Sequence, residues 1–393
     1  MKQLFYGGVH PAEHKELSEH KPIRPLNKAP AEVVIPMSMH IGAPCKPVVA
    51  KGDTVMVGQV IGETAGLGAP IHASVSGTVK AVEPRPGTGG TPTMSVVIEN
   101  DFQNTLHPDC KPRENVDALT PQEIIDDPDV NAIYVATPPS SHATYAIMAM
   151  KAGKPVYVEK PLAASYEDCA RINRISEQTG IPCFVAYYRR YLPYFQKVKE
   201  IVTSGRIGKI INVQIRYTEP LRAADAEAIK NGTPLPWRLQ PEIAGGGYFY
   251  DMAPHQLDML QDIFGVILEA RGIHANRGGY YEAEDSVSAC FRFENGLPGS
   301  GSWCYVAHES AREDCIEIIG TEGQVSFSVF DYNPIRLQTS EGDERITVPN
   351  PPYVQYPIIK NVIEHLQGLA ICTCTSVSAT PVNWVMDRIL GKL

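Results

Sequence analysis

Residues 152–161 read Ala152-Gly153-Lys154-Pro155-Val156-Tyr157-Val158-Glu159-Lys160-Pro161. The short apolar run from Pro155 to Val158 predicts a strand, and it ends abruptly at Glu159-Lys160-Pro161. In open α/β sheets the carboxyl ends of the strands face the ligand crevice. A lysine at such an end can shift its pKa and join a proton relay. A solvated lysine at the strand end is the alternative interpretation.

A second stretch combines three glycines with titratable residues at helical spacing. It reads Gly245-Gly246-Gly247-Tyr248-Phe249-Tyr250-Asp251-Met252-Ala253-Pro254-His255-Gln256-Leu257-Asp258. On a helix, Asp251, His255 and Asp258 share one face, and the glycines allow a backbone or a ligand to come close to the helix start. Histidine can accept and return a proton near pH 7, and a nearby carboxylate can orient its ring. A buried histidine satisfied by the aspartate one turn away is the other interpretation.

Together the two stretches resemble the Gfo/Idh/MocA family of NAD(P)-dependent oxidoreductases, whose signatures are Glu-Lys-Pro and a Gly-Gly, Asp, three-residue gap, His pattern. The resemblance covers about residues 127–393. It implies that a substrate C–H gives hydride to the nicotinamide while the hydroxyl proton passes to a base. In that scheme His255 accepts the proton, and Lys160 completes the relay or holds the substrate oxygen. Asp251 would bind substrate hydroxyls and orient His255.

The resemblance also implies which residues contact the cofactor and the substrate. The cofactor-binding set, beside the nicotinamide ribose, is Thr137, Pro138, His142, Glu159 and Lys160. The substrate-binding set is Trp237, Arg238 and Arg190. A place in the core is the alternative for Trp237, and a surface ion pair is the alternative for Arg190. Donors of these kinds suit a sugar- or polyol-like substrate.

Residues 127–207 alternate strands with helices, which indicates a doubly wound parallel sheet. We expect strands at 132–136, a buried one, 155–158 and 182–186, and helices at 140–152, 165–179 and 194–204. A dinucleotide fold also needs a first strand and a glycine-rich turn that holds the pyrophosphate, and no such fingerprint precedes Asp127. The sequence therefore predicts a partial α/β Rossmann-like sheet, weak binding of NAD or NADP, and an uncovered edge on the strand at 132–136.

Residues 208–393 predict an α+β domain with an open, mainly antiparallel sheet, which in the family supplies the substrate pocket and often an oligomer interface. The expected strands are 210–217, 286–294, 299–307, 315–320, 324–330 and 335–338. The expected C-terminal helices are 354–366 and 380–390, the second with Thr380 as N-cap and Pro381 at its first position. A homo-oligomer through this sheet is expected.

Residues 1–100 are rich in proline, glycine and short β-branched runs, which predicts a small all-β domain. Residues 49–79 resemble the barrel-sandwich fold of biotinyl and lipoyl carriers, but the hairpin at 64–70 has no lysine to hold biotin or lipoyl. Residues 101–126 are expected to form a linker and a junction helix, with Thr120 as N-cap and Pro121 at its first position.

A fuller resemblance of the amino-terminal part is to the first domain of RnfC, a subunit of a membrane-associated electron-transport complex. Four motifs carry it: Gly7-Gly8-Val9-His10-Pro11, Lys21-Pro22-Ile23, His40-Ile41-Gly42-Ala43-Pro44 and Val75-Ser76-Gly77-Thr78-Val79. The resemblance implies peripheral docking to a membrane complex through residues 1–100. The nucleotide-binding domain and the cysteine clusters that make RnfC a redox subunit have no counterpart in this sequence.

The composition is that of a globular multidomain protein: 393 residues, of which 43% are hydrophobic and 20% charged. A net charge of −9 argues against a nucleic-acid partner. No run of about 18 apolar residues and no signal-peptide core is present, so we expect no transmembrane segment and a cytoplasmic location. The nine cysteines lack zinc or iron–sulfur spacing, so we expect no metal and no Fe–S cluster.

Three interpretations of function follow. The first is a Gfo/Idh/MocA-type oxidoreductase acting on CH–OH groups, impaired by loss of the glycine-rich half of its cofactor domain. The second is a non-catalytic docking or assembly module of an electron-transport complex. The third is a non-functional chimaera of two reading frames joined near residues 119–130.

Overall fold

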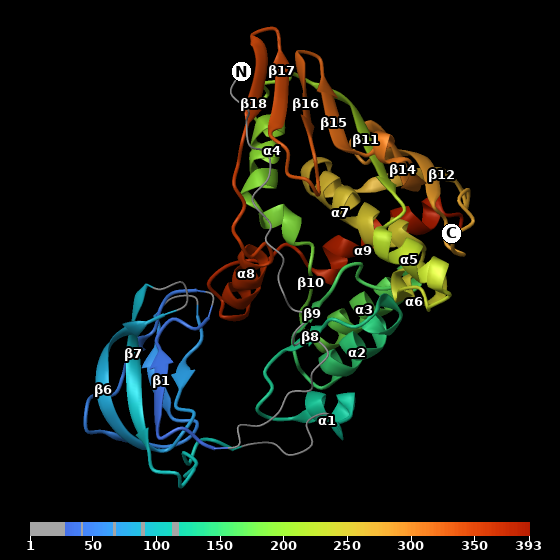
Figure 1. Cartoon of the computed structure of the whole chain (residues 1–393). Helices are drawn as coiled ribbons and strands as arrows, with labels where there is room; N and C mark the ends of the chain where they lie inside the picture. The colour runs from blue at the N-terminus through green and yellow to red at the C-terminus, as the bar shows by residue number, and fades with distance from the viewer. Residues whose placement is uncertain (1–27, 41, 66–67, 88–90, 112–117) are drawn as a thin grey trace. The chain divides into compact units, whose positions relative to one another are not determined.

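The computed structural model describes residues 28–40, 42–65, 68–87, 91–111 and 118–393. The predicted motifs at Gly7 and Lys21, together with Ile41 and part of the hairpin at 64–70, lie outside the described residues. The chain divides into two compact units, residues 1–117 and 118–393 (Figure 1). The junction helix predicted near Thr120 belongs to the second unit.

The first unit is built from strands that form two small antiparallel sheets. They are β1 Glu32–Pro36, β2 Lys46–Pro47, β3 Thr54–Val55, β4 Val60–Glu63, β5 Ile71–His72, β6 Gly77–Pro86 and β7 Pro92–Asn100. The order is β1-β7-β6-β3 in one sheet and β2-β4-β5 in the other, and Ile35, Ile61 and Ile98 are buried in their shared core. Gly77 has a φ of 153°, and a side chain there would collide with the carbonyl of Glu99 on β7. The predicted barrel-sandwich domain is confirmed.

The second unit begins with the predicted capping box. Thr120 accepts a hydrogen bond from the Glu123 amide, and the Glu123 side chain accepts one from the Thr120 amide. Helix α1 therefore starts at Pro121 and ends at Asp126, where Asp127-Pro128 prevents its continuation. Its buried residue, Ile125, joins the core of the second unit.

Three short parallel strands follow, in the order β10-β9-β8. The elements are β8 Ile133–Val135, α2 Pro139–Lys151, β9 Val156–Val158, α3 Tyr166–Thr179, β10 Cys183–Val185, η4 Tyr188–Tyr191 and α4 Pro193–Thr203. In register, Val135 lies opposite Val158, and Val158 lies opposite Val185. The predicted partial Rossmann-like sheet is confirmed, and Figure 1 shows α2 and α3 side by side next to it.

Strand β8 forms one edge of this sheet. Ile133 donates its amide to Pro155, and Val135 accepts from Glu159, both at 2.9 Å. Because hydrogen-bonding groups alternate along a strand, the backbone amide and carbonyl of Tyr134 face away from β9. Within the described residues no strand pairs there, and Tyr134 is 54% exposed. The predicted uncovered edge is confirmed, whereas the expectation of a buried strand is wrong, because an edge strand exposes alternate residues.

The rest of the unit contains an eight-stranded sheet in the order β12-β13-β14-β11-β15-β16-β17-β18. Its strands are β11 Ile210–Pro220, β12 Ile267–Ala275, β13 Ser286–Phe293, β14 Pro298–Ala307, β15 Glu313–Gly320, β16 Gly323–Phe327, β17 Ile335–Thr339 and β18 Gly342–Ile346. Only β11 and β14 pair in parallel. The predicted open, mainly antiparallel sheet is confirmed, and β12 and β18 were not predicted.

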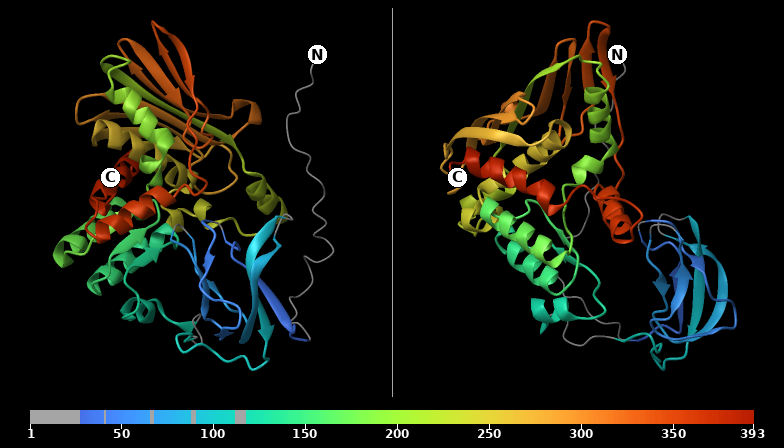
Figure 2. Two further views of the ribbon diagram at one scale, coloured as in Figure 1. Left: turned by 90° about the vertical axis from the view of Figure 1, so that its left-hand side faces the viewer. Right: turned by 180° about the vertical axis from the view of Figure 1, so that it is seen from behind.

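The helices of this part are α5 Ala223–Asn231, η5 Trp237–Leu239, α6 Pro241–Ala244, α7 Gly247–Phe264, η6 Glu309–Ala311, α8 Tyr356–Leu366 and α9 Ser376–Ile389. Helix α7 packs on β13 and β14, α4 on β16, and α9 on β12. Figure 2 shows these helices gathered on one face of the large sheet. A single core runs through the whole unit, from Val158 and Phe184 to Tyr250 and Trp303.

The predicted start of the last helix is wrong. Helix α9 begins at Ser376, because Thr375 and Ser378 form a capping box. Thr380 lies inside the helix and donates its hydroxyl to the Ser376 carbonyl at 2.8 Å, and Pro381 is likewise internal.

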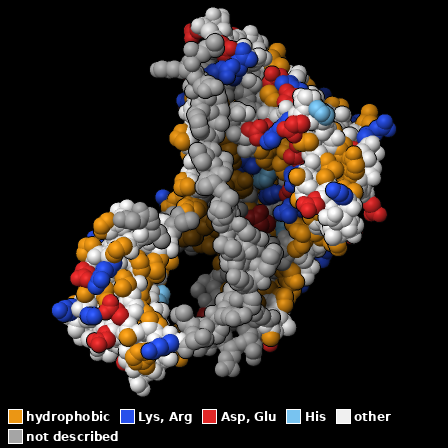
Figure 3. Space-filling view, in the orientation of Figure 1, with side chains coloured by type: hydrophobic (Ala, Val, Ile, Leu, Met, Phe, Trp, Pro, Cys, Tyr) orange, Lys and Arg blue, Asp and Glu red, His pale blue; other side chains and the backbone are white. Residues whose placement is uncertain are grey.

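Charged side chains of both signs are interspersed on the face of the second unit that Figure 3 displays. No described helix combines the length and the apolar character needed to cross a bilayer.

Candidate functional site

The turn after β9, the short helix η5 and the first turns of α7 meet in the second unit. Gly245 makes this approach feasible: its φ is 93°, and a Cβ there would lie 2.6 Å from the Ala164 carbonyl oxygen. The glycines before α7 therefore bring the helix start against the segment that follows Lys160, as their spacing indicated.

Lys160 and Asp251 form the central contact. The Lys160 Nζ donates to Oδ1 of Asp251 at 2.5 Å and to its backbone carbonyl at 2.9 Å. Both side chains are largely buried, at 15% and 17% exposure. Burial raises the pKa of the Asp251 carboxyl, but the charge and hydrogen bond of Lys160 outweigh it and lower the pKa overall. Asp251 is therefore ionised at neutral pH.

Arg238 and Trp237 lie at the same carboxylate. The Arg238 Nε is 3.4 Å from Oδ2 of Asp251, and its guanidinium carbon lies 4.3 Å from the centroid of the Trp237 ring. Trp237 is half-buried rather than enclosed. The structure thus brings these two predicted substrate-binding residues to the Lys160–Asp251 pair.

His255 lies one turn further along α7 and is 5% exposed. Its Nδ1 is buried without a hydrogen-bond partner. Burial, with the positive charges of Arg189 and Lys160, lowers the pKa of the imidazole well below its ordinary value, so the ring is neutral at pH 7. Such an unsatisfied polar atom is uncommon in a folded protein and is what a proton acceptor awaiting its donor requires.

The predicted partnership of Asp251 with His255 is not formed. Residues 118–393 are described throughout, and no hydrogen bond joins the two side chains, because Asp251 is taken by Lys160. The alternative interpretation, a histidine satisfied by that aspartate, fails for the same reason. Instead the His255 ring packs edge-on against Tyr188, at 5.6 Å between centroids, and Phe330, at 5.8 Å.

The predicted cofactor-binding residues lie at the carboxyl ends of β8 and β9. The His142 ring is fully buried, with Nε2 2.7 Å from the Thr137 carbonyl oxygen and Nδ1 3.0 Å from that of Pro161. It therefore ties the turn after β8, which contains Pro138, to the turn after β9. Glu159 accepts hydrogen bonds from the Tyr134 hydroxyl at 2.6 Å and from the Gln355 amide at 3.0 Å.

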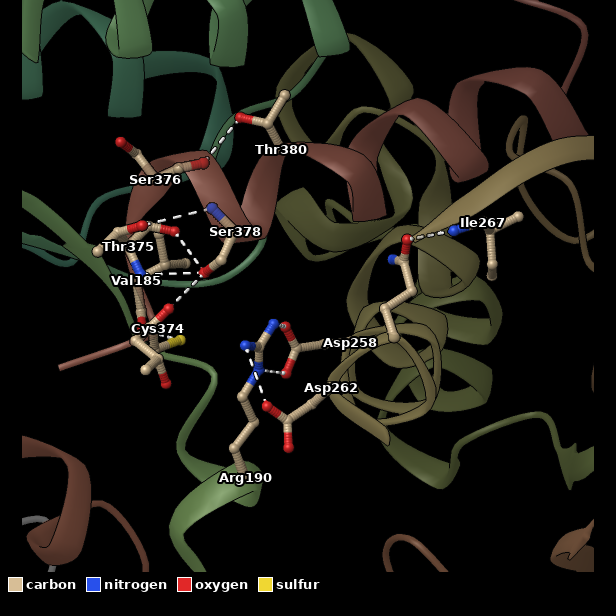
Figure 4. A network of polar contacts seen from close by, with 12 residues as sticks. Val185, Arg190, Asp258, Asp262, Ile267, Cys374, Thr375, Ser376, Ser378 and Thr380 are labelled. Atoms are coloured by element: carbon tan, nitrogen blue, oxygen red, sulfur yellow. Dashed lines mark hydrogen bonds and ion pairs between the residues drawn. The ribbon is translucent and has the colours of Figure 1, made fainter. Parts of the chain in front are cut away.

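Arg190 is held away from the site. Its Nε donates to Oδ2 of Asp258 at 2.7 Å, Nη2 donates to Oδ1 of the same carboxylate, and Asp262 lies 3.5 Å from Nη1 (Figure 4). The ion pair is buried, with Arg190 7% and Asp258 1% exposed. A substrate contact from Arg190 is thus not seen, and the ion pair lies inside the protein rather than on its surface.

Three residues near the site were not predicted. Tyr188 and Arg189 precede Arg190, and the aromatic residues around them gave no signal because they come from distant segments. Arg222 donates to Glu219 at 3.1 and 3.0 Å and lies 3.8 Å from the centroid of the Tyr248 ring. The spacing of Glu219 and Arg222, three residues apart after a strand, was the one available sign. Among the described residues, no three His, Cys, Asp or Glu side chains come together as metal ligands.

A nicotinamide dinucleotide is matched here only in part. Thr137, Glu159 and Lys160 lie at the carboxyl edge of the sheet, where the nicotinamide side of such a cofactor would lie. The three turns that leave β8, β9 and β10, residues 136–138, 159–165 and 186–187, contain no glycine. A pyrophosphate needs backbone amides that approach closely at such a turn, so the residues present do not fit that half of the cofactor.

Three family models match the chain. "RnfC Barrel sandwich hybrid domain" matches residues 3–103, "Oxidoreductase family, NAD-binding Rossmann fold" of the Gfo/Idh/MocA group matches residues 90–187, and "GFO/IDH/MocA C-terminal domain" matches residues 195–326. The two oxidoreductase models and the RnfC model thus follow one another along the chain.

Individual relatives agree with this division. The chain is 34% identical over 280 residues to Oxidoreductase P35 of Formosa agariphila, covering 70% of this chain and 82% of that protein. It is 53% identical over 109 residues to the RnfC-type subunit of the Na(+)-translocating ferredoxin:NAD(+) oxidoreductase complex of Acetobacterium woodii, over 28% of this chain but only 24% of that relative. A solved levoglucosan dehydrogenase in complex with NADH and levoglucosan superposes with a TM-score of 0.60 and 25% identity, over 69% of this chain and 80% of that one.

Proposed function

This chain belongs to the Gfo/Idh/MocA family of oxidoreductases, with an RnfC-type barrel-sandwich domain at its amino-terminal side, and from that premise we propose that it oxidises a hydroxyl of a sugar- or polyol-like substrate. One observation carries the proposal: the bonded pair of Lys160 and Asp251 lies beside His255, a neutral histidine whose Nδ1 is buried without a partner. The levoglucosan complex supports the substrate class.

The residues have complementary roles in the proposed reaction. His255 takes the proton from the substrate hydroxyl, and the Lys160 ammonium stabilises the negative charge that develops on the oxygen. Asp251 fixes Lys160 and, with Arg238, binds neighbouring hydroxyls. The nicotinamide supplies an acceptor for the hydride that leaves the same carbon, so that the C–OH becomes C=O. Thr137, Pro138, His142 and Glu159 shape the cofactor side.

The proposal includes weak binding of the cofactor. The partial fit described above supports it, because the pyrophosphate contacts that orient such a cofactor come from a glycine-rich turn that the sequence lacks. The choice between NAD and NADP falls to residues of the same missing half, so we expect little preference between them.

Activity is best tested at millimolar NAD⁺ or NADP⁺ with a panel of sugars and polyols that includes levoglucosan. Formation of reduced cofactor is followed by absorbance for the parent chain and for His255→Asn. The matched control is His274→Asn, a half-buried histidine 3.4 Å from Glu284. The proposal expects a rate that the first variant loses and the second keeps. Equal rates in parent and His255→Asn, or no reduced cofactor with any substrate, would contradict it.

A second candidate function concerns the first unit alone. Its 53% identity over 109 residues to an RnfC-type subunit supports a docking surface for the neighbours of such a protein. The test is whether purified full-length chain binds an Rnf complex from which the RnfC protein has been removed. The same complex with its RnfC protein in place is the control, and equal binding to both would refute docking at that position.

A further inference from the structure

Arg189 is a buried cation without a counter-ion. It is 5% exposed, and among the described residues no carboxylate lies within 4 Å of it, whereas its neighbour Arg190 holds Asp258. The Arg189 Nη1 donates to the Val329 carbonyl at 2.5 Å and to the Tyr332 hydroxyl at 2.6 Å, and its Nε is buried without a partner. An unpaired buried charge is costly, so its position calls for a reason.

Aromatic rings take the place of a carboxylate around Arg189. Its guanidinium carbon lies 4.6 Å from the ring centroid of Phe330, 5.2 Å from Tyr188, 5.5 Å from Tyr332 and 5.9 Å from Phe195. Cation–π attraction offsets part of the desolvation cost without neutralising the positive charge. The charge is therefore felt by whatever else touches these rings.

His255 touches two of the same rings. Tyr188 and Phe330 pack edge-on against its imidazole, so Arg189 and His255 share two aromatic neighbours. Arg189 also joins the two segments that carry them, because it belongs to η4 with Tyr188 and bonds to the loop that contains Val329 and Phe330. Removing Arg189 would loosen both rings.

The charged and titratable groups around His255 come from several elements. Arg189 and Tyr188 lie on η4, Lys160 follows β9, and Asp251 is one turn away on α7 itself. Asp251 is neutralised by Lys160, and Phe330 carries no charge. Arg189 is thus the cation of this set without an acidic partner, and it, with Lys160, disfavours a second positive charge on the imidazole.

We propose that Arg189 is a positioning residue for His255: it fixes Tyr188 and Phe330 as the walls around the imidazole and keeps the ring in its neutral, proton-accepting form. The inference deepens the proposed function and rests on it for its catalytic meaning, but the protonation state of His255 can be measured without cofactor or substrate.

The test is an NMR titration of the full chain labelled with ¹³C-histidine, with the His255 signal identified by its loss in His255→Asn. Arg189→Met removes the charge, and Arg189→Lys keeps it. Arg388→Met is the matched control, since Arg388 also lies near an aromatic ring, 5.9 Å from Trp384, and also has a buried, unpaired Nε.

We expect the titration midpoint of His255 to rise by about one pH unit in Arg189→Met and to stay near the parent value in Arg189→Lys and Arg388→Met. Should Arg189→Met fail to fold, Arg189→Gln removes the charge while keeping a hydrogen-bond donor for Val329. A folded, uncharged variant in which His255 titrates as in the parent would overturn the inference. Because no turnover is required, this outcome is separate from failure of the proposed oxidoreductase activity.

Discussion

The Nζ of Lys160 lies 2.5 Å from the carboxylate and 2.9 Å from the backbone carbonyl of Asp251. This double contact joins the turn after β9 to the first turns of α7, which are 91 residues apart in the chain. It gives the lysine a fixed position next to His255 and keeps Asp251 ionised. The proposed chemistry depends on this arrangement.

Removal of the lysine is therefore expected to abolish most of the activity. Lys160→Met should lower kcat/KM about 100-fold or more, because the charge that stabilises the developing alkoxide is lost. The measurement is steady-state kinetics at millimolar cofactor. Lys199→Met is the control, because Lys199 forms an ion pair with Asp262 on the outer part of α4. A similar loss in both variants would show that Lys160 has no specific role.

The buried ion pair of Arg190 and Asp258 predicts a stability effect. Asp258→Asn leaves a buried guanidinium without its counter-ion, and we expect a loss of about 3 to 5 kcal/mol in the free energy of unfolding. Asp343→Asn, which breaks the exposed pair with Arg336, should cost about 1 kcal/mol or less. Tryptophan fluorescence in urea reports on the second unit, because Trp237, Trp303 and Trp384 all lie there. Equal effects of the two substitutions would contradict the structural role of Asp258.

Burial of a neutral His255 predicts acid sensitivity. In the unfolded chain a histidine takes up a proton as the pH falls through about 6.5, whereas the folded His255 does not, because its pKa is lowered. The contribution is therefore absent above pH 6.5 and destabilising below it, by about 1.4 kcal/mol at pH 5.5.

The matching measurement compares urea unfolding at pH 7.5 and 5.5 for the parent and for His255→Gln. The variant should lose less stability between these two pH values than the parent does. An unchanged difference would mean that His255 is protonated in the folded state.

The edge of β8 predicts self-association. The backbone of Tyr134 is unpaired on one side within the described residues, and a hollow of about 280 Å³ beside it is lined by apolar side chains that include Ile124, Ile133 and Tyr145. Unpaired apolar edges favour pairing with another chain. Tyr134→Lys should lower concentration-dependent association in analytical ultracentrifugation. Tyr280→Lys, at a position 47% exposed in a loop, should leave it unchanged, and the reverse pattern would place the interface elsewhere.

Local signals predicted local structure well. The Thr120, Pro121 and Glu123 pattern gave α1, and the glycines with Asp251 and His255 gave the start of α7. Where two caps compete, local chemistry was less decisive: Thr375 with Ser378 begins α9, and Thr380 is internal.

Contacts between distant segments could not be predicted from spacing. Helical periodicity placed Asp251 and His255 on neighbouring turns, but it did not show that Lys160 would take the carboxylate. It likewise did not show that Asp258 would be buried with Arg190, or that Arg189 would share two rings with His255. The site residues of one helix were thus predictable, and their partners on other elements were not.

The most direct test of the account is titration of the full chain with NADH and with NADPH, followed by fluorescence. The account holds that the hydride-transfer residues are present while the pyrophosphate site is missing, so it predicts dissociation constants of about 1 mM or weaker for both cofactors. Saturable binding of either one in the micromolar range would contradict it, because residues 136–138 and 159–165 would then be sufficient to hold the dinucleotide without a glycine-rich turn.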